Sequence, residues 1–202
     1  MIPYRYNIRM FVSISAVLAI ITFAASTHFL QQYGANYIVT PSAISAVLAG
    51  FWWAFDKYLW RLRFVRALKI SELPDLNGTW IGTIDRAGEN NPHKITYEIT
   101  QTYTTLAIRS QTRSSESNTI LAAFKTNEAG TQYVIMNYWL CRTKARDGSG
   151  AMEEFKGLSR ISIWDEDGKM VLKDYYFTNR NPSTEGTAKL TKRLICEEQD
   201  GD

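Results

Sequence analysis

Two long uncharged stretches near the amino terminus limit what this chain can fold into. No residue in 10–30 carries a formal charge at neutral pH, and none in 37–55 does either. A helix needs about 20 mostly apolar residues to cross the hydrocarbon core of a bilayer, and both stretches reach about that length. The sequence therefore predicts two transmembrane helices, at about residues 10–30 and 38–60, that form a hairpin in the membrane.

Basic residues around the two stretches predict their orientation. Arg5 and Arg9 precede the first stretch, and the connecting segment 31–36 carries no charge. The basic residues that follow the second stretch are Lys57, Arg61, Arg63, Arg66 and Lys69. Because cytoplasmic segments are enriched in Lys and Arg, we expect a multi-pass protein of the inner membrane whose amino and carboxyl termini are both cytoplasmic.

The first stretch has an alternative interpretation as a cleaved signal peptide. Arg5 and Arg9 provide a basic start, and Ala24, Ala25 and Ser26 resemble a cleavage region. The hairpin is favoured because the first stretch is long and a second one follows after a short turn.

The charge of the chain divides at the end of the membrane segment. Residues 1–70 contain seven Lys or Arg and one Asp, whereas residues 71–202 contain sixteen Lys or Arg and nineteen Asp or Glu. The basic excess therefore lies beside the bilayer, where anionic headgroups attract it. The net charge of +3 does not indicate binding to a DNA or RNA polymer.

Residues 71–202 predict a cytosolic, all-β domain. Strand signals recur at short intervals, with Gly, Asn, Asp and Pro between them. The expected strands are 78–84, 94–102, 105–112, 117–124, 132–143, 154–164, 170–178 and 186–194. The expected turns include 88–92, 127–130, 147–150, 165–168 and 179–182. Eight short strands with tight connections favour an antiparallel up-and-down barrel, since closure removes the exposed sheet edges.

The first and last strands carry a short motif of lipocalin-like barrels. Gly78-Thr79-Trp80, with Arg193 near the end of the last strand, is similar to the Gly-x-Trp and arginine pair that closes one end of a lipocalin barrel. We therefore assign Trp80 to barrel closure.

Alternation along two strands predicts which side chains share a face. The predicted row on the second strand is Ile95, Tyr97, Ile99 and Gln101. The predicted row on the seventh strand is Leu172, Asp174, Tyr176, Thr178 and Arg180. Both predictions assume that neither strand is shifted by one residue, because such a shift would exchange the two faces.

Several segments match, in order, the motifs of one family. They are Leu73-Pro-Asp-Leu-Asn-Gly-Thr-Trp80-Ile-Gly82, Gln101-Thr-Tyr103 followed by Ile108 and Ser114-Ser-Glu-Ser117, Phe155-Lys-Gly157, and Tyr176-Phe-Thr-Asn-Arg180 with Gly186. Together with two membrane helices before the barrel, they resemble the membrane effectors of CBASS, the cyclic-oligonucleotide-based antiphage signalling system of bacteria. The resemblance spans nearly the whole chain.

The resemblance implies a function in antiphage defence. It implies that the barrel binds a cyclic dinucleotide made by a cGAS-like nucleotidyltransferase, and that the helices then oligomerise and disrupt the inner membrane, causing abortive cell death. The implied partners are that dinucleotide, the lipid bilayer and further copies of the chain. We expect no catalytic residue, cofactor or metal site, because the sequence has no nucleophile elbow, Walker loop or metal-ligand spacing.

The chemistry of a cyclic dinucleotide suggests which residues bind it. Its phosphates favour Arg and hydroxyl donors, and its bases favour aromatic faces with amide or hydroxyl partners at their edges. The candidate ligand-binding residues are Tyr97, Gln101, Tyr103, Ser115, Ser117, Tyr138, Tyr176, Thr178 and Arg180.

The second apolar stretch places small residues at steps of four, on one side of a helix. They are Ser42, Ala46, Gly50 and Ala54. Small side chains let another helix approach closely. Two partners stay open for this small-residue stripe: the first helix of the same chain, or another copy of the chain.

One rival function remains for the barrel. A membrane-anchored lipocalin-like binder of a small apolar ligand or lipid would also carry the Gly-x-Trp motif, although it would favour a more apolar interior. The two cysteines, Cys141 and Cys196, are too few for a disulfide framework and suit a reducing compartment.

Overall fold

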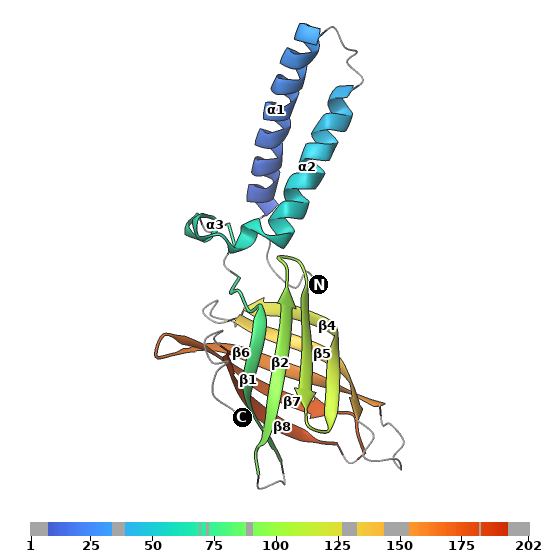
Figure 1. The fold of residues 1–202 in the computed structure, drawn as a ribbon, viewed down its shortest axis with the longest axis vertical. Helices are drawn as coiled ribbons and strands as arrows, with labels where there is room; N and C mark the ends of the chain where they lie inside the picture. Colours follow the sequence, from blue (N-terminus) through green and yellow to red (C-terminus); the bar gives the residue numbers. More distant parts are fainter. Residues whose placement is uncertain are drawn as a thin grey trace, which may run out of the picture. The chain divides into compact units, whose positions relative to one another are not determined.

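The computed structural model describes residues 8–33, 39–68, 70–71, 73–87, 91–126, 133–143, 154–181 and 183–193. Arg5, Lys69, Cys196 and most of the loops expected at 88–92, 127–130 and 147–150 lie outside these residues. The described chain forms two compact units, one helical and one a β-barrel (Figure 1). The helical unit contains the described residues up to Asp75 together with Thr102–Thr104, and the barrel contains the rest.

Four helical elements make up most of the helical unit. They are α1 (Ile8–Tyr33), α2 (Val39–Lys57), the 3-10 turn η1 (Leu59–Arg61) and α3 (Arg63–Ala67).

Helices α1 and α2 pack against each other. The Phe11 and Trp52 rings stack with centroids 4.4 Å apart, and Trp52 Nε1 donates a hydrogen bond to Ser15 Oγ at 3.1 Å. Since Phe11 lies at the start of α1 and Trp52 near the end of α2, the two helices are antiparallel.

The two helices differ in how well they suit a bilayer. Within the described residues, one helix is long and apolar enough to cross a membrane, and its span is Arg9–Phe29. Helix α2 ends at Lys57 instead of the expected 60 and already contains Asp56. Its uncharged part is therefore shorter than the roughly 20 residues that a crossing needs.

The small-residue stripe of α2 does not pack against α1. Ser42, Ala46 and Gly50 are exposed, and Ala54 is half-buried. A Cβ atom added at Gly50 would meet no atom within 4 Å. The sequence allows two partners for this stripe, α1 or another copy of the chain. In the described chain, α1 does not pack against it.

The second unit is the predicted barrel. All eight strands pair antiparallel with their neighbours in chain order, and β1 closes on β8 (Figure 1). The strands are β1 (Gly78–Arg86), β2 (His93–Gln101), β3 (Leu106–Thr112), β4 (Ser115–Thr126), β5 (Tyr133–Thr143), β6 (Glu154–Glu166), β7 (Lys169–Thr178) and β8 (Glu185–Lys192). The up-and-down barrel fold is therefore confirmed.

One end of the barrel is closed by packed side chains. Trp80 and Leu76 are fully buried, and Trp80 Nε1 donates to the Leu76 carbonyl oxygen at 2.8 Å. Gln101 Oε1 accepts a hydrogen bond from the Leu76 backbone N–H, also at 2.8 Å. Both polar groups of the Leu76 backbone are therefore satisfied, which lets this segment seal the barrel.

The cation beside Trp80 is not the one that the sequence predicts. The Lys192 ammonium group lies 5.9 Å from the centroid of the Trp80 ring. Lys192 pairs directly with Trp80 across β1 and β8, so the alternation of side chains places Arg193 on the other side of its strand. The expectation of Arg193 was therefore wrong by one residue, although its backbone N–H does bond Thr79 of β1, at 2.9 Å.

Candidate functional site

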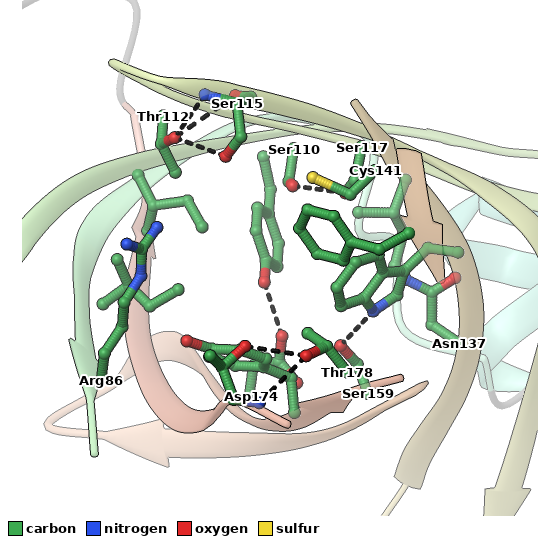
Figure 2. Close-up of a pocket in the computed structure, with 18 of the residues that line it drawn as sticks. Arg86, Ser110, Thr112, Ser115, Ser117, Asn137, Cys141, Ser159, Asp174 and Thr178 are labelled. Carbon is green, nitrogen blue, oxygen red and sulfur yellow. Dashed lines mark hydrogen bonds between the residues drawn. The ribbon is translucent and has the colours of Figure 1, made fainter. Parts of the chain in front are cut away.

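A cavity lies at the barrel end opposite Trp80. Its lining comes from strands β1 to β7, together with Ala87 after β1 and with Arg180 and Thr184 between β7 and β8 (Figure 2). The unfilled space, counting the part open to solvent, measures about 900 Å³. Below the cavity the barrel is filled by buried apolar side chains, including Ile135, Ile161, Leu172 and Leu190.

Six of the nine predicted ligand residues line this cavity. They are Tyr97, Ser115, Ser117, Tyr176, Thr178 and Arg180. Five of the six lie within strands whose alternation puts them on the inner face, and Arg180 follows the end of β7. Within β2 and within β7, buried residues alternate with less buried ones over most of the strand. The residues of each predicted row that lie in these strands therefore share one face.

The other three predicted residues lie elsewhere. Gln101 faces inward but belongs to the closed end of the barrel, where it bonds Leu76. Tyr103 belongs to the helical unit, where its ring contacts Phe55 at 5.1 Å between centroids. Tyr138 alternates with the inward residues of β5, so it lies on the outer face of the sheet.

Aromatic side chains form one wall of the cavity. Trp139 of β5 lies 6.1 Å from the Phe155 ring and 6.4 Å from the Tyr176 ring, centroid to centroid. Its Nε1 donates to Ser159 Oγ at 2.9 Å, which fixes the plane of the indole. Stacking on such faces is a main source of affinity for nucleic acid bases.

Two glycines make room for these rings. A Cβ atom at Gly157 would overlap the Trp139 indole, and one at Gly186 would lie 2.8 Å from the Tyr176 hydroxyl oxygen. A glycine inside a strand often marks such a close approach. The family-like motifs that contain Gly157 and Gly186 therefore have a local role in placing the aromatic wall.

Hydroxyl groups ring the mouth of the cavity. Ser110 and Ser117 share a hydrogen bond of 2.6 Å, Thr112 and Ser115 one of 2.8 Å, and Thr178 and Thr184 another of 2.8 Å (Figure 2). Each hydroxyl can act as donor or acceptor. The rim is therefore polar but carries no fixed sign of charge at these positions.

Two arginines bring positive charge to the same end. Arg86 ends β1 and Arg180 follows β7, and both line the cavity. The Arg180 guanidinium lies over the Phe155 ring, 4.6 Å from its centroid. Burial raises the pKa of the Cys141 thiol, while a hydrogen bond from Ser115 and the charges of both arginines act to lower it. Guanidinium groups match the geometry of phosphate oxygens, so this end suits an anionic ligand.

A buried carboxyl group lies deeper in the cavity. The Tyr97 hydroxyl donates to Asp174 Oδ2 at 2.5 Å. Burial raises the pKa of Asp174 from its usual 3.8 to about 6, although the hydrogen bond from Tyr97 and the nearby Ser159 hydroxyl favour the charged form. Burial and the neighbouring carboxylate also raise the pKa of Tyr97 well above its usual value. The Tyr97 phenol is therefore the donor of this pair.

Sequence reasoning missed several cavity residues, and some had a signal. Arg86 continues the inward row of Trp80 and Ile84 at steps of two, and it was missed because the first strand was ended at residue 84. Trp139 and Asn137 lie on a strand with apolar residues on both faces. Such a strand gives no alternation from which the inner face can be assigned.

The cavity brings together several kinds of ligand-binding group. Within the described residues, no group of three or more His, Cys, Asp or Glu side chains is placed to hold a metal ion. The cavity instead combines aromatic faces, hydroxyl groups and two guanidinium groups. These are the groups that a ligand with bases and phosphates requires.

Comparison with known proteins gives consistent matches. The family model "Cap15, cyclic dinucleotide receptor domain" matches residues 71–192, more than half of the chain. A CD-NTase-associated protein 15 from Yersinia aleksiciae is 24% identical over 187 residues, covering 89% of this chain and 86% of that protein. A CD-NTase-associated protein 15 from Escherichia albertii is 36% identical over 75 residues, and this aligned segment covers only 36% of each protein.

Proposed function

The chain belongs to the Cap15 family of cyclic dinucleotide receptor domains, and from that premise we propose that it is a CBASS effector that couples ligand binding to membrane disruption. In this proposal the barrel cavity binds the cyclic dinucleotide, and the helical unit then damages the inner membrane. The observation that carries the ligand part is the joint presence of Arg86, Arg180 and the Trp139 wall in one cavity.

Each part of a cyclic dinucleotide has a matching group in the cavity. The two phosphates lie near the two guanidinium groups and the rim hydroxyls, where charge-assisted hydrogen bonds form. At least one base stacks on the aromatic wall of Trp139, Phe155 and Tyr176. The ligand-binding residues of this proposal are Tyr97, Ser115, Ser117, Tyr176, Thr178 and Arg180, together with Arg86, Trp139 and Asn137.

Thermal unfolding of the full chain in detergent micelles tests the ligand class. The ligands are a panel of purine and pyrimidine cyclic dinucleotides and a long-chain fatty acid. One cyclic dinucleotide is expected to raise the melting temperature, because a ligand at a hundredfold excess over its dissociation constant stabilises the folded state by about 2.7 kcal/mol. Stabilisation by the fatty acid alone would instead favour the lipocalin-like binder.

Arg180→Ala tests the phosphate contact. We expect binding of the stabilising dinucleotide to weaken at least about tenfold, because a hydrogen bond to a charged group contributes about 1.5–3 kcal/mol. The matched control is Arg160→Ala, which removes an arginine from the exposed outer face of β6. Equal affinity of the Arg180→Ala and Arg160→Ala variants would contradict the assignment.

The exposed surface of α1 supports a membrane location. Val12, Ile20, Ile21, Phe23 and Phe29 are each more than half exposed in the described structure. Large apolar side chains in such positions are unfavourable in water and suit a lipid environment. We propose that α1 and α2 both enter the inner membrane and that both termini are cytoplasmic, as the distribution of Lys and Arg indicates.

We propose that ligand binding promotes assembly through the small-residue stripe of α2. The stripe is exposed within the chain, and close helix contacts in membranes use small residues. Gly50→Leu should leave the fold and the barrel cavity unchanged, since nothing lies within 4 Å of the added Cβ atom. It should abolish dye entry into cells that co-express a cyclic dinucleotide synthase.

The control for this experiment is Ala49→Leu, which adds the same side chain at an exposed position beside the stripe. It should permeabilise cells as the unmodified chain does. Equal dye entry with Gly50→Leu would remove the stripe from the mechanism, and dye entry without a synthase would remove the ligand-dependent switch.

A further inference from the structure

Asp174 is the deepest polar side chain of the β7 row. The inward residues of this row run from Arg180 at the mouth through Thr178 and Tyr176 to Asp174, and Leu172 below them is fully buried. Asp174 is 2% exposed and lines the cavity. Among the described residues that line the cavity, Asp174 is the one with a carboxyl group.

The protein uses only part of the acceptor capacity of this carboxylate. Tyr97 donates to Oδ2 and the Ser159 hydroxyl lies near the carboxyl group, whereas Oδ1 has no hydrogen-bond partner within the described part of the chain. A carboxylate has about four acceptor sites, and leaving a buried acceptor unpaired is unfavourable. The cavity floor therefore has a strong acceptor that a donor on the ligand can satisfy.

The charges of the cavity fix which part of a cyclic dinucleotide reaches this acceptor. Arg86 and Arg180 lie at the mouth, and Asp174 lies at the floor. A phosphate beside Asp174 would place two negative charges together in a buried site, which is strongly unfavourable. The phosphates therefore stay near the arginines, and a base edge points toward Asp174.

The four bases differ in how they match a carboxylate. Guanine presents two adjacent donors on its Watson–Crick edge, N1–H and the N2 amino group, which pair with the two oxygens of a carboxylate. Adenine and cytosine present one amino group beside a ring nitrogen acceptor, and uracil places carbonyl oxygens on both sides of its N3–H. Acceptors beside a carboxylate oxygen repel it, so guanine alone fits without an unfavourable contact.

Building on the proposed function, we propose that Asp174 recognises the Watson–Crick edge of a guanine base, so that the chain selects a guanine-containing cyclic dinucleotide. Tyr97 is a positioning residue, because its hydrogen bond to Oδ2 orients the carboxylate. The Trp139 and Tyr176 rings flank the space above Asp174 and supply faces for the same base.

Isothermal titration of the full chain in lipid nanodiscs tests this assignment. The probes are cyclic di-GMP, cyclic di-AMP and cyclic di-UMP. The unmodified chain should bind cyclic di-GMP roughly tenfold to a hundredfold more tightly than the other two, the discrimination typical of one bidentate base contact. Asp174→Asn keeps the size of the side chain but replaces one acceptor by a donor, so this preference should fall by at least about tenfold.

Glu166→Gln is the matched control, because it makes the same carboxylate-to-amide change on the exposed outer side of the barrel, where Glu166 bonds Lys173 and Lys189. It should leave the order of affinities unchanged. Tighter binding of cyclic di-UMP or cyclic di-AMP by the unmodified chain overturns the guanine assignment, and an unchanged preference in Asp174→Asn overturns the role of Asp174. Binding of none of the three probes would contradict the proposed function itself.

A second measurement needs no variant. Titration of cyclic di-GMP at pH 6, in two buffers with different ionisation enthalpies, gives the number of protons exchanged on binding. Donors from guanine favour the charged carboxylate, so about half a proton should be released at a pH near the pKa of Asp174, which is about 6. The other titratable groups that line the cavity are Arg86, Arg180, Tyr97 and Cys141, and the raised pKa values of Tyr97 and Cys141 keep both neutral at this pH. Proton uptake would place a phosphate beside Asp174 and overturn the proposal.

Discussion

The two ends of the barrel use the same eight strands for different purposes. At the closed end, Trp80 and Leu76 are fully buried, and the polar groups of Leu76 are bonded to Trp80 and Gln101. At the open end, the inward positions of the same strands carry Arg86, Tyr97 and Asp174, and one oxygen of Asp174 lacks a partner. The paired backbone of Leu76 holds the closed end together, whereas the unpaired oxygen of Asp174 gives the open end an acceptor for a ligand.

The contrast follows from depth along each strand. On β1 the inward row passes from Trp80 to Arg86, and on β7 it passes from Leu172 to Arg180. A period of two fixes the face of each residue in both halves. The apolar half supplies burial that stabilises the barrel, and this allows the other half to keep polar groups that contribute little to stability.

The largest effect on stability is expected at the closed end. Trp80→Ala should lower the free energy of unfolding by about 3–5 kcal/mol, because it removes a fully buried indole and leaves a cavity. This is a large part of the 5–15 kcal/mol that typically separates folded from unfolded domains. Urea unfolding of the full chain in detergent, followed by the β-sheet circular dichroism signal, measures the change.

Phe155→Ala provides the comparison at the open end. Phe155 is half-buried, and its ring lies beside the solvent-open cavity. Its removal should cost clearly less stability than the loss of Trp80. An equal loss in both variants would show that the two ends contribute alike to the fold, which contradicts the comparison.

The second effect is a dependence of stability on pH at the open end. The raised pKa of Asp174 means that the folded chain holds this proton more tightly than the unfolded chain does. The stability that Asp174 contributes is therefore fully present below about pH 4 and is lost as the pH rises through about 6. The loss amounts to at most about 3 kcal/mol.

Asp174→Asn removes this titration. The free energy of unfolding of the variant, relative to that of the unmodified chain, should therefore increase as the pH rises from 4 to 7. Glu166 works in the opposite direction, because hydrogen bonds from Lys173 and Lys189 lower its pKa. Its contribution is lost on acidification, but it is present in both proteins and cancels in the difference. Parallel pH profiles for the two proteins would contradict the effect of burial on Asp174.

The sequence was sufficient to predict the barrel because its turns and alternation are local signals. Every strand lies within two residues of its predicted start and end. The membrane segment was predicted less well, since α2 ends at Lys57 and η1 follows it. Trp60 was expected near the end of that helix, but it lies in η1 and is fully buried. A local apolar pattern does not distinguish such a turn from a longer helix.

The site was predicted in part because alternation gives the face of a residue but not its depth. Gln101 and Tyr97 share a face of β2, yet they lie toward opposite ends of the barrel. Strand β4 also has a register shift between Thr119 and Leu121, which changes the β4 residue that lies opposite Tyr138. The bulge has no signal in the nearby sequence, and the motif that assigns Trp80 to the closed end does not show that Gln101 lies there too.

The smallest effects separate the two faces of one strand. Trp139 and Tyr138 are neighbours on β5, but only Trp139 lines the cavity. Trp139→Leu keeps apolar bulk and removes the aromatic face, so the affinity for the stabilising dinucleotide should fall by about 1–3 kcal/mol, the contribution of stacking on one base. Tyr138→Leu makes a similar change on the outer face, beside Leu121 and Leu158, and should leave the affinity unchanged. Titration of both variants in nanodiscs measures the difference. If Tyr138→Leu weakened binding as much as Trp139→Leu, the ligand would have to contact the outer face of β5, and the open end would no longer be the site.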